Sequence, residues 1–345
     1  MRNIFQMLVA AAVAGISGAV PALGQDMKVL TLPYFDDPAF YGGYEERYDD
    51  FPQMIVFDWY GGAEEKEKLQ AFGGADIAML CADEVPIWIE SGVLHPWDDR
   101  QLEAVDRPAD YRPIDEALRE IGHYFVPLEL GVNRLIYNPV EVPISEVTNL
   151  DLFHDPRYAG RLLLPGSVTD LAAAAYLSQG ATRWHSPDDE VTSAAIEWIQ
   201  KAKANDVIFY ESEDQLYDLV YDEGALAVFT FNAIFYEGYG SDLALAPGVS
   251  GISYFACGYG RTNPDPDMSE AVHDFVNLAR NEESAALLAS WGEMVADKEL
   301  AAAAFEGRET GMTLNDDDLV FYQTPMPVEL HELFGKVIND SEHGS

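Results

Sequence analysis

The sequence predicts an α/β protein with two domains. Short apolar segments alternate with segments of helical periodicity, and brief polar connections separate them, which is typical of a parallel sheet covered by helices. The chain has 345 residues, which is too many for one hydrophobic core and suits two. Its composition is that of a folded globular protein, with 48% hydrophobic and 12% aromatic residues.

The first 24 residues have the features of a cleaved signal peptide. Arg2 carries the only side-chain charge among them, residues 7–20 are mostly apolar, and Gly24 offers a small residue for cleavage before Gln25. The stretch is short for a membrane anchor, no cysteine follows it for lipidation, and no later segment approaches about 20 apolar residues. We therefore expect a soluble protein exported to the periplasm. The alternative is an uncleaved N-terminal anchor.

The charge of the chain excludes some classes of partner. Lys and Arg number 20 against 60 Asp and Glu, which gives a formal net charge of −40. Such a surface repels the phosphates of nucleic acids and anionic lipids, so we expect neither as a partner. Two explanations of this charge remain open, of which solubility in a salty habitat is favoured over recognition of a ligand. The same field attracts cationic solutes.

The N-terminal half places a polar segment at the end of a predicted buried strand. Strands are expected at residues 28–32, 54–59 and 75–80, and helices at 44–48, 64–72 and 85–91. The segment CADE, residues 81–84, follows the third strand directly. Ligands of open α/β sheets bind outside the carboxyl ends of the strands, so this segment is a candidate binding site.

The C-terminal half continues the α/β pattern without internal repeats. An extended segment is expected at 124–138, further strands at 161–164, 225–231 and 251–257, and helices at 170–179, 191–204, 269–280, 285–295 and 327–338. No low-complexity linker separates the halves. We therefore expect two domains connected by several chain crossings.

Catalytic and metal chemistry are weakly supported by the sequence. A catalytic Cys81 needs a nearby base, and none of the seven histidines lies in a motif around it. No zinc pattern occurs, and the acidic segment 315–319 lacks the glycine and final glutamate of a calcium loop. We expect no enzyme activity, no metal and no cofactor. Cys81 and Cys257 either form a disulfide or remain two buried thiols.

Aromatic and acidic residues near the predicted strand ends indicate a site for a cation. Aromatic faces attract cations, and carboxylates accept charged hydrogen bonds. The aromatic residues are Tyr34, Phe35, Phe231, Tyr254 and Phe255, and the acids are Asp83 and Asp170. Packing in the hydrophobic core would by itself explain about half of the aromatic residues at these positions.

A succession of segments carries a family resemblance. These segments are KVLTLPY, ADIAMLCADEVPIWIESGVLHPWD, YFVPLELGVNRLIYN, LDLFHDPRYAGRLLLP, YDEGALAVFTFNAIF, GISYFACGY, MSEAVHDFVNLARNEESAALLASWG and FYQTPMP. In this order the chain resembles the periplasmic solute-binding proteins of ABC importers, extracellular solute-binding family 1, and in particular the spermidine/putrescine-binding type.

The resemblance implies a type II periplasmic-binding-protein fold. Each of two lobes would be a sheet flanked by helices, with a ligand cleft between the lobes that closes on binding. Lobe one would comprise residues 26–138 and 258–310, and lobe two residues 139–257 and 311–345. The implied partners are a small amine and the permease subunits in the inner membrane, with the binding protein itself a monomer.

The resemblance also implies a set of ligand-binding residues. The family's positions fall on Tyr34, Phe35, Cys81, Asp83, Ser167, Asp170, Phe231, Asn232, Tyr254 and Gln323. Two of the family's acids are lost, because Ser167 and Ala256 occupy their positions, whereas Asp83 adds one. Fewer acids favour a smaller or singly charged amine, or a polyamine held in a shifted register. Glu129 either adds another acid or has a structural role.

Arg134 leaves a second ligand class open. If its guanidinium faces the cleft, it would bind a carboxylate or phosphonate in a bidentate manner, and the ligand would be an amino acid or an aminophosphonate. If it faces away, it is a surface or packing charge. An iron receptor is disfavoured because the chain contains no Tyr-Tyr pair.

Overall fold

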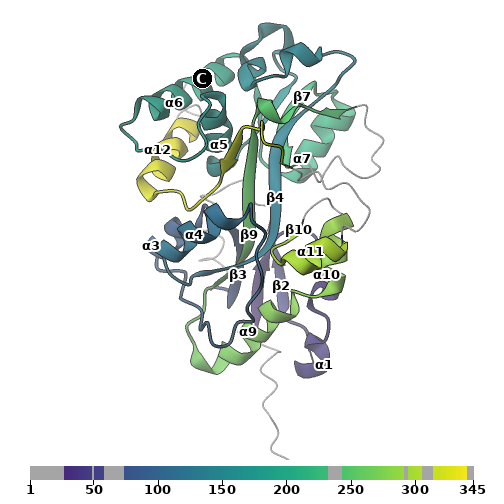
Figure 1. Cartoon of the computed structure of the whole chain (residues 1–345), viewed down its shortest axis with the longest axis vertical. Coiled ribbons are helices and arrows are strands. Elements are labelled where there is room, and N and C mark those ends of the chain that lie inside the picture. Colours follow the sequence, from purple (N-terminus) through teal and green to yellow (C-terminus); the bar gives the residue numbers. More distant parts are fainter. Residues whose placement is uncertain are drawn as a thin grey trace, which may run out of the picture.

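Two long antiparallel strands connect the two halves of the molecule (Figure 1). The computed structural model describes residues 27–48, 50–57, 74–231, 243–290, 294–304 and 314–339. The long strands are β4 (Phe125–Tyr137) and β9 (Ile252–Arg261). In Figure 1 the helices and strands form a lower group and an upper group, and both long strands run through the two groups. The strands therefore form one continuous sheet. Its main strands have the order β2-β1-β3-β9-β4-β7-β5-β6.

The lower group begins with a parallel sheet. Strand β1 (Lys28–Thr31) pairs in parallel with β2 (Gln53–Val56) and β3 (Ile77–Cys81), and β3 pairs antiparallel to β9. Strand β10 (Met294–Val295) pairs with β4. The helices of this group are η1 (Pro38–Tyr41), α1 (Tyr44–Tyr48), α3 (Val85–Glu90), α4 (Arg112–Glu120), η7 (Pro266–Met268), α9 (Ser269–Leu278), α10 (Glu282–Ser290) and α11 (Lys298–Ala304).

The upper group is also α/β. Strand β5 (Leu162–Pro165) pairs in parallel with β6 (Ile208–Tyr210) and β7 (Ala227–Phe231), while β8 (Ala244–Leu245) pairs with β4 and β11 (Val320–Tyr322) with β9. Its helices are η2 (Ile144–Glu146), η3 (Leu150–His154), η4 (Pro156–Tyr158), α5 (Val168–Ser178), α6 (Glu190–Ala204), α7 (Glu213–Tyr217), η5 (Asp218–Asp222), η6 (Gly248–Ser250) and α12 (Val328–Asn339).

Each group has a hydrophobic core on both faces of its sheet. In the lower group one face packs on α9 and α10 and the other on α3 and α4. In the upper group one face packs on α5, α6 and α12 and the other on α7 and η5. None of the described helices is long and apolar enough to cross a membrane.

The side chains on one face of β4 belong to the core of the lower group at one end of the strand and to the core of the upper group at the other end. Glu129 pairs with Cys257, which belongs to the α9/α10 core, whereas Leu135, on the same alternating face, belongs to the α5/α6 core. Gly131 lies midway between them and pairs with Phe255. The face therefore passes from one core to the other at Gly131 and Phe255, where the two groups meet.

Most of the expected elements are present. The extended segment 124–138 is β4, and the alanine-rich helix expected at 170–179 is α5, which begins two residues earlier at Val168 and is capped by Ser167. The expected strand 251–257 continues to Arg261, so the expected lobe boundary at 257/258 falls inside β9. The lobe boundaries remain predictions.

Two expectations about helices were incomplete or wrong. The helix expected at 285–295 ends at Ser290, and Met294–Val295 is instead a strand on β4. Helix α4, with Ile114 and Leu118 buried, was not expected. The expected helix 64–72 lies outside the described residues.

Candidate ligand-binding site

Asp83 is a buried carboxyl group at the junction of the two groups. It lies between the end of β3 and the start of α3, and it is 1% exposed. Neither of its carboxyl oxygens has a hydrogen-bond partner of normal geometry among the described residues. Its backbone carbonyl accepts a hydrogen bond from the amide of Met326, 2.9 Å away, in the segment between β11 and α12. Asp83 therefore faces the upper group although it belongs to the lower one.

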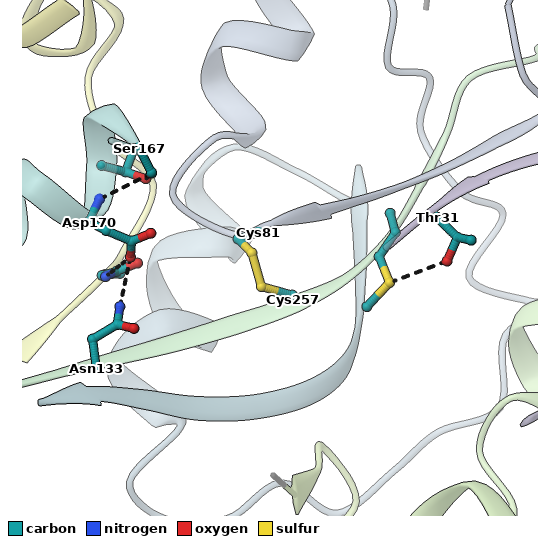
Figure 2. The surroundings of a disulfide bond; sticks show 9 residues. Thr31, Cys81, Asn133, Ser167, Asp170 and Cys257 are labelled. Carbon is teal, nitrogen blue, oxygen red and sulfur yellow. Dashed lines mark hydrogen bonds between the residues drawn. A yellow bond between two sulfur atoms is a disulfide. The ribbon is translucent and has the colours of Figure 1, made fainter. Parts of the chain in front are cut away.

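Asp170 lies in the first turn of α5 and is held by amide side chains. Its Oδ1 accepts hydrogen bonds from Asn133 Nδ2 at 2.7 Å and from Gln323 Nε2 at 2.8 Å (Figure 2). Gln323 Nε2 also donates to Ser253 Oγ at 2.7 Å. The helix begins at Ser167, whose hydroxyl caps it by accepting from the amide of Asp170. Asn133 in β4 and Gln323, which follows β11 and is itself held by Ser253 in β9, thus fix this carboxylate in one orientation.

The two carboxyl groups interact across the junction. Burial and the neighbouring charge of Asp170 raise the pKa of Asp83 to about 7. The nearby hydroxyl of Thr169 and local backbone amides lower it only in part. Burial also raises the pKa of Asp170, although hydrogen bonds from Gln323 and Asn133 act in the opposite direction. Two negative charges at Asp83 and Asp170 repel each other, so this pair of carboxyl groups favours binding either a proton or a cation.

Cys81 and Cys257 form a disulfide, which confirms one of the two alternatives left open by the sequence. The two residues face each other directly on the antiparallel strands β3 and β9. Figure 2 shows the bond together with Asp170, Ser167 and Asn133. A disulfide sulfur is not a thiolate, so Cys81 is unsuited to nucleophilic catalysis in this form.

A second acidic pair lies close to the disulfide. Glu129 pairs with Cys257 in the sheet and is 5% exposed. Burial, with the charge of Glu213 in the first turn of α7, raises the pKa of Glu129 to about 8. Glu129 is therefore a buried acid, and it does not have the exposed environment of an outward-facing structural residue.

The expected aromatic residues occupy different environments. Tyr34 is 53% exposed, whereas Phe35 is 4% exposed and packs on Phe40 in the lower core, with ring centroids 5.0 Å apart. Phe231 is half-buried at the end of β7, opposite Asn133. Asn232 lies outside the described residues.

Tyr254 and Phe255 lie on opposite faces of β9. Tyr254 is fully buried on the face that packs against α3 and α4, and its ring centroid is 5.7 Å from that of Tyr322. Phe255 is half-buried and lies on the opposite face, which it shares with Ser253. Phe255 is therefore a better candidate for ligand contact than Tyr254.

Arg134 faces away from Asn133 and from Asp170, to which Asn133 is hydrogen-bonded. It follows Asn133 in β4, so its side chain projects from the other face of the strand, and its guanidinium donates to the carbonyl oxygen of Ala246. Within the described ranges, no Arg or Lys is among the groups that shift the pKa of Asp83, Asp170 or Glu129. The alternative in which Arg134 binds a ligand carboxylate in the cleft is not supported by this geometry.

Four residues near Asp83, Asp170 and Glu129 were not among the expected binding residues. Asn133 and Ser253 contact Asp170 or Gln323, and both belong to long strands in which alternation could have assigned a face. Phe255 was noted but not assigned to the site. Glu213 gave no sequence signal, because its position beside Glu129 depends on how α7 packs. Among the described residues, no group of three or more His, Cys, Asp or Glu side chains is arranged to hold a metal ion.

The fold is that of the two-lobed substrate-binding proteins of ABC transporters. A protein from Listeria monocytogenes described as a spermidine/putrescine ABC transporter has a TM-score of 0.70 and 16% identity, over 93% of this chain and 99% of that one. MotA from A. tumefaciens B6, in complex with glucopine, has a TM-score of 0.70 and 16% identity, over 91% and 99% of the two chains. The Tp0655 (TpPotD) lipoprotein of Treponema pallidum has the same TM-score and identity, over 90% and 98%. The sequence matches no protein-family model and no curated protein.

Proposed function

We propose that this protein is the periplasmic substrate-binding component of an ABC importer and that it captures a small cationic amine. The observation that carries the proposal is the carboxyl pair of Asp83, which is buried, and Asp170, which is half-buried, contributed by the two groups of elements. A buried carboxylate without a partner costs several kcal/mol. An ammonium group placed between the two carboxylates would remove this cost.

The composition of the site favours a cation over an anion. Asp83 and Glu129 are buried acids and Asp170 is half-buried, and the contacts of these groups within the described chain include no Arg or Lys. Phe231 and Phe255 add half-buried aromatic faces, which favour ammonium groups. A net charge of −40 also attracts cationic solutes and repels nucleic acids.

Capture would couple ligand binding to closure of the lobes. Because Asp83 and Asp170 belong to different groups of elements, an ammonium bound between them stabilises the arrangement in which they are close. This closed, monomeric, liganded form would then dock on the permease subunits. Export to the periplasm would follow from cleavage of the predicted signal peptide near Gln25.

A zwitterionic amine is the second candidate. The likeness to MotA bound to glucopine equals the likeness to the polyamine-type proteins, and AgtB from A. tumefaciens, bound to agropinic acid, has a TM-score of 0.66 at 17% identity. Such a ligand needs a cationic or amide partner for its acid group. Arg134 does not provide it in the described geometry.

The test is a thermal-shift screen of the mature protein at fixed salt. The ligands are putrescine, spermidine, monoamines, basic and neutral amino acids, and aminoethylphosphonate. A ligand present at about 100 times its dissociation constant adds about 2.7 kcal/mol to the stability, which raises the melting temperature measurably. Stabilisation by amines without an acid group supports the proposal, whereas stabilisation only by zwitterions contradicts it.

A further inference from the structure

The segment QTPMP, residues 323–327, connects β11 to α12 and contacts both acids of the junction. We call this segment the strap. At its start, Gln323 Nε2 donates to Asp170 Oδ1 at 2.8 Å. Near its end, the amide of Met326 donates to the backbone carbonyl of Asp83 at 2.9 Å. The helix that follows, α12, contacts α3 of the lower group (Figure 1). One short segment therefore holds an acid of the upper group and an acid of the lower group.

Two prolines make the strap stiff. Pro325 and Pro327 each have a fixed φ angle and no amide hydrogen. The residue before a proline is confined to extended conformations, which restricts Thr324 and Met326 as well. The amide of Thr324 donates to the carbonyl of Tyr322 at 2.8 Å. Met326 therefore provides the amide of residues 324–327 that reaches across the junction.

The strap is anchored in the upper group. The side chain of Met326 is fully buried in the core formed with α5, α6 and α12. The carbonyl of Thr324 accepts a hydrogen bond from Trp184 Nε1 at 2.6 Å, and the amide of Gln323 donates to the carbonyl of Tyr254 at 2.9 Å. These contacts make the strap move with the upper group.

The backbone at Asp83 is anchored in the lower group. The disulfide between Cys81 and Cys257 joins β3 to β9 two residues before Asp83. The amide of Ala82 then donates to the carbonyl of Ala256 at 2.8 Å. Asp83 thus follows two firm connections to β9, and its own carbonyl meets the strap. The bond to the strap joins one anchored segment to another.

We propose that the strap is a positioning element that sets the separation of the Asp83 and Asp170 carboxyl groups, through the hydrogen bond from the Met326 amide to the Asp83 carbonyl. This inference rests on the proposed function, in which the two acids bind one cation. When the groups of elements move apart, the bond to Asp83 breaks, whereas the contact of Gln323 with Asp170 stays within the upper group. A site whose acids are already in place loses less freedom on binding, so a stiff strap raises affinity.

Hydrogen exchange of the Met326 amide tests the bond directly. The full mature chain, labelled with ¹⁵N-methionine, would be measured by NMR without any ligand. The amide should exchange at least about 3- to 10-fold more slowly than in an unstructured chain, the protection expected of one hydrogen bond. Exchange at the rate of an unstructured chain would overturn the proposal.

A loosened strap should change the titration of Asp83. Burial and the charge of Asp170 raise the pKa of Asp83 to about 7, and Glu84 adjoins it in the chain. In Pro325→Ala/Pro327→Ala the two carboxyl groups can separate, so the pKa of Asp83 should move toward its ordinary value. Carboxyl ¹³C NMR follows this titration, and Asp83→Asn identifies the signal. A purely structural strap would leave the pKa unchanged.

The same variant should weaken a cationic probe through Asp83. Putrescine affinity, measured by calorimetry, should fall by about 3- to 10-fold in Pro325→Ala/Pro327→Ala. In the Asp83→Asn background the same two substitutions should change it by less than about twofold, because the positioned carboxylate is absent. Pro139→Ala/Pro143→Ala, at two exposed prolines of the upper group, is the matched control and should change neither affinity nor the Asp83 titration.

Replacing the Met326 amide by an ester removes the donor and keeps the buried side chain. Putrescine affinity should again fall by about 3- to 10-fold. Melting temperatures of all variants identify any loss caused by misfolding.

The outcomes separate this inference from the proposed function. If amines bind, but the loosened strap matches the proline control in affinity and in the Asp83 titration, the positioning role is refuted and amine binding stands. If no amine binds, the proposed function fails, while amide protection and a shifted Asp83 titration would still support the strap.

Discussion

The carboxyl group of Asp83, which follows β3, interacts with that of Asp170, in the first turn of α5, across the junction of the two halves of the molecule. Asp170 is held by two amide donors, whereas Asp83 has none of normal geometry in the described chain. This asymmetry indicates that Asp83 is the member of the pair that takes up a proton when no ligand is bound.

Asp83→Asn should stabilise the ligand-free protein and impair binding. At pH 8 the substitution removes a buried charge, so we expect the free energy of unfolding to rise by about 1–3 kcal/mol. Amine affinity should fall by about 10- to 100-fold, since one of the two carboxylates is lost. Urea denaturation and calorimetry measure the two effects. An unchanged affinity would remove Asp83 from the site.

Stability and binding should depend on pH in opposite directions. The pKa of Asp83 is raised from 3.8 to about 7 and that of Glu129 from 4.5 to about 8 by burial and a neighbouring acid. The folded state therefore retains protons that the unfolded state has lost, so ligand-free stability falls as the pH rises from 5 to 8. The slope is up to about 1.4 kcal/mol per pH unit for each group. Amine binding should tighten over the same range and release protons.

The pH experiment needs a comparison with variants. Burial lowers the pKa of His273 and His331, which changes stability in the opposite sense below about pH 6.5. The difference between the unmodified protein and Asp83→Asn or Glu129→Gln cancels these histidines. A difference that does not vary between pH 5 and 8 would contradict the assignment.

Removing the disulfide should destabilise the protein. The bond closes a loop with a sequence separation of 176 residues between Cys81 and Cys257. Replacing both cysteines with serine should lower the free energy of unfolding by about 2–5 kcal/mol. Urea denaturation measures this change, and thiol titration of unfolded, unreduced protein should detect no free thiol in the unmodified chain. Two free thiols would show that the bond does not form.

Neighbouring aromatic residues on β9 should behave differently. Phe255→Ala should lower amine affinity by about 3- to 30-fold, because a half-buried ring near the ligand is lost, with a small effect on stability. Tyr254→Ala should lower the free energy of unfolding by about 3–5 kcal/mol, because its ring is fully buried in the core. The reverse pattern would mean that Tyr254 faces the ligand.

Arg134→Met should discriminate between the two ligand classes. The guanidinium donates to the carbonyl of Ala246 on the face opposite Asn133, so the substitution should reduce stability while leaving amine affinity within about twofold. Melting temperature and calorimetry with putrescine measure these effects. A specific loss of amino acid binding would show that Arg134 anchors a carboxylate after all.

Local patterns in the sequence predicted the elements that carry the site. The apolar run before CADE is β3, and Asp83 lies at its carboxyl end as expected. The alanine-rich segment is α5, with Ser167 as its cap and Asp170 in its first turn. These features depend on short-range preferences, namely the burial of parallel strands and the capping of helix ends.

Contacts between distant segments were not predictable in the same way. Tyr254 and Phe255 lie on opposite faces of β9, and the sequence did not show which face meets the junction, because a shift of one residue in a strand exchanges the two faces. Glu129 and Glu213 are separated in sequence by β5, α5, α6 and β6, and the effect of Glu213 on the pKa of Glu129 depends on how α7 packs in the folded chain.

The sequence by itself determined the α/β class, the order of the elements and the acidic, aromatic character of the candidate site, because hydrophobic periodicity and composition are local properties. The tertiary structure decided which acids meet, that Cys81 pairs with Cys257, and that Arg134 points away from Asp170. These outcomes depend on the register of β4 and β9 and on the approach of α5 and α7 to them. Register and helix packing arise from contacts across the whole chain, so they are settled only when both cores form.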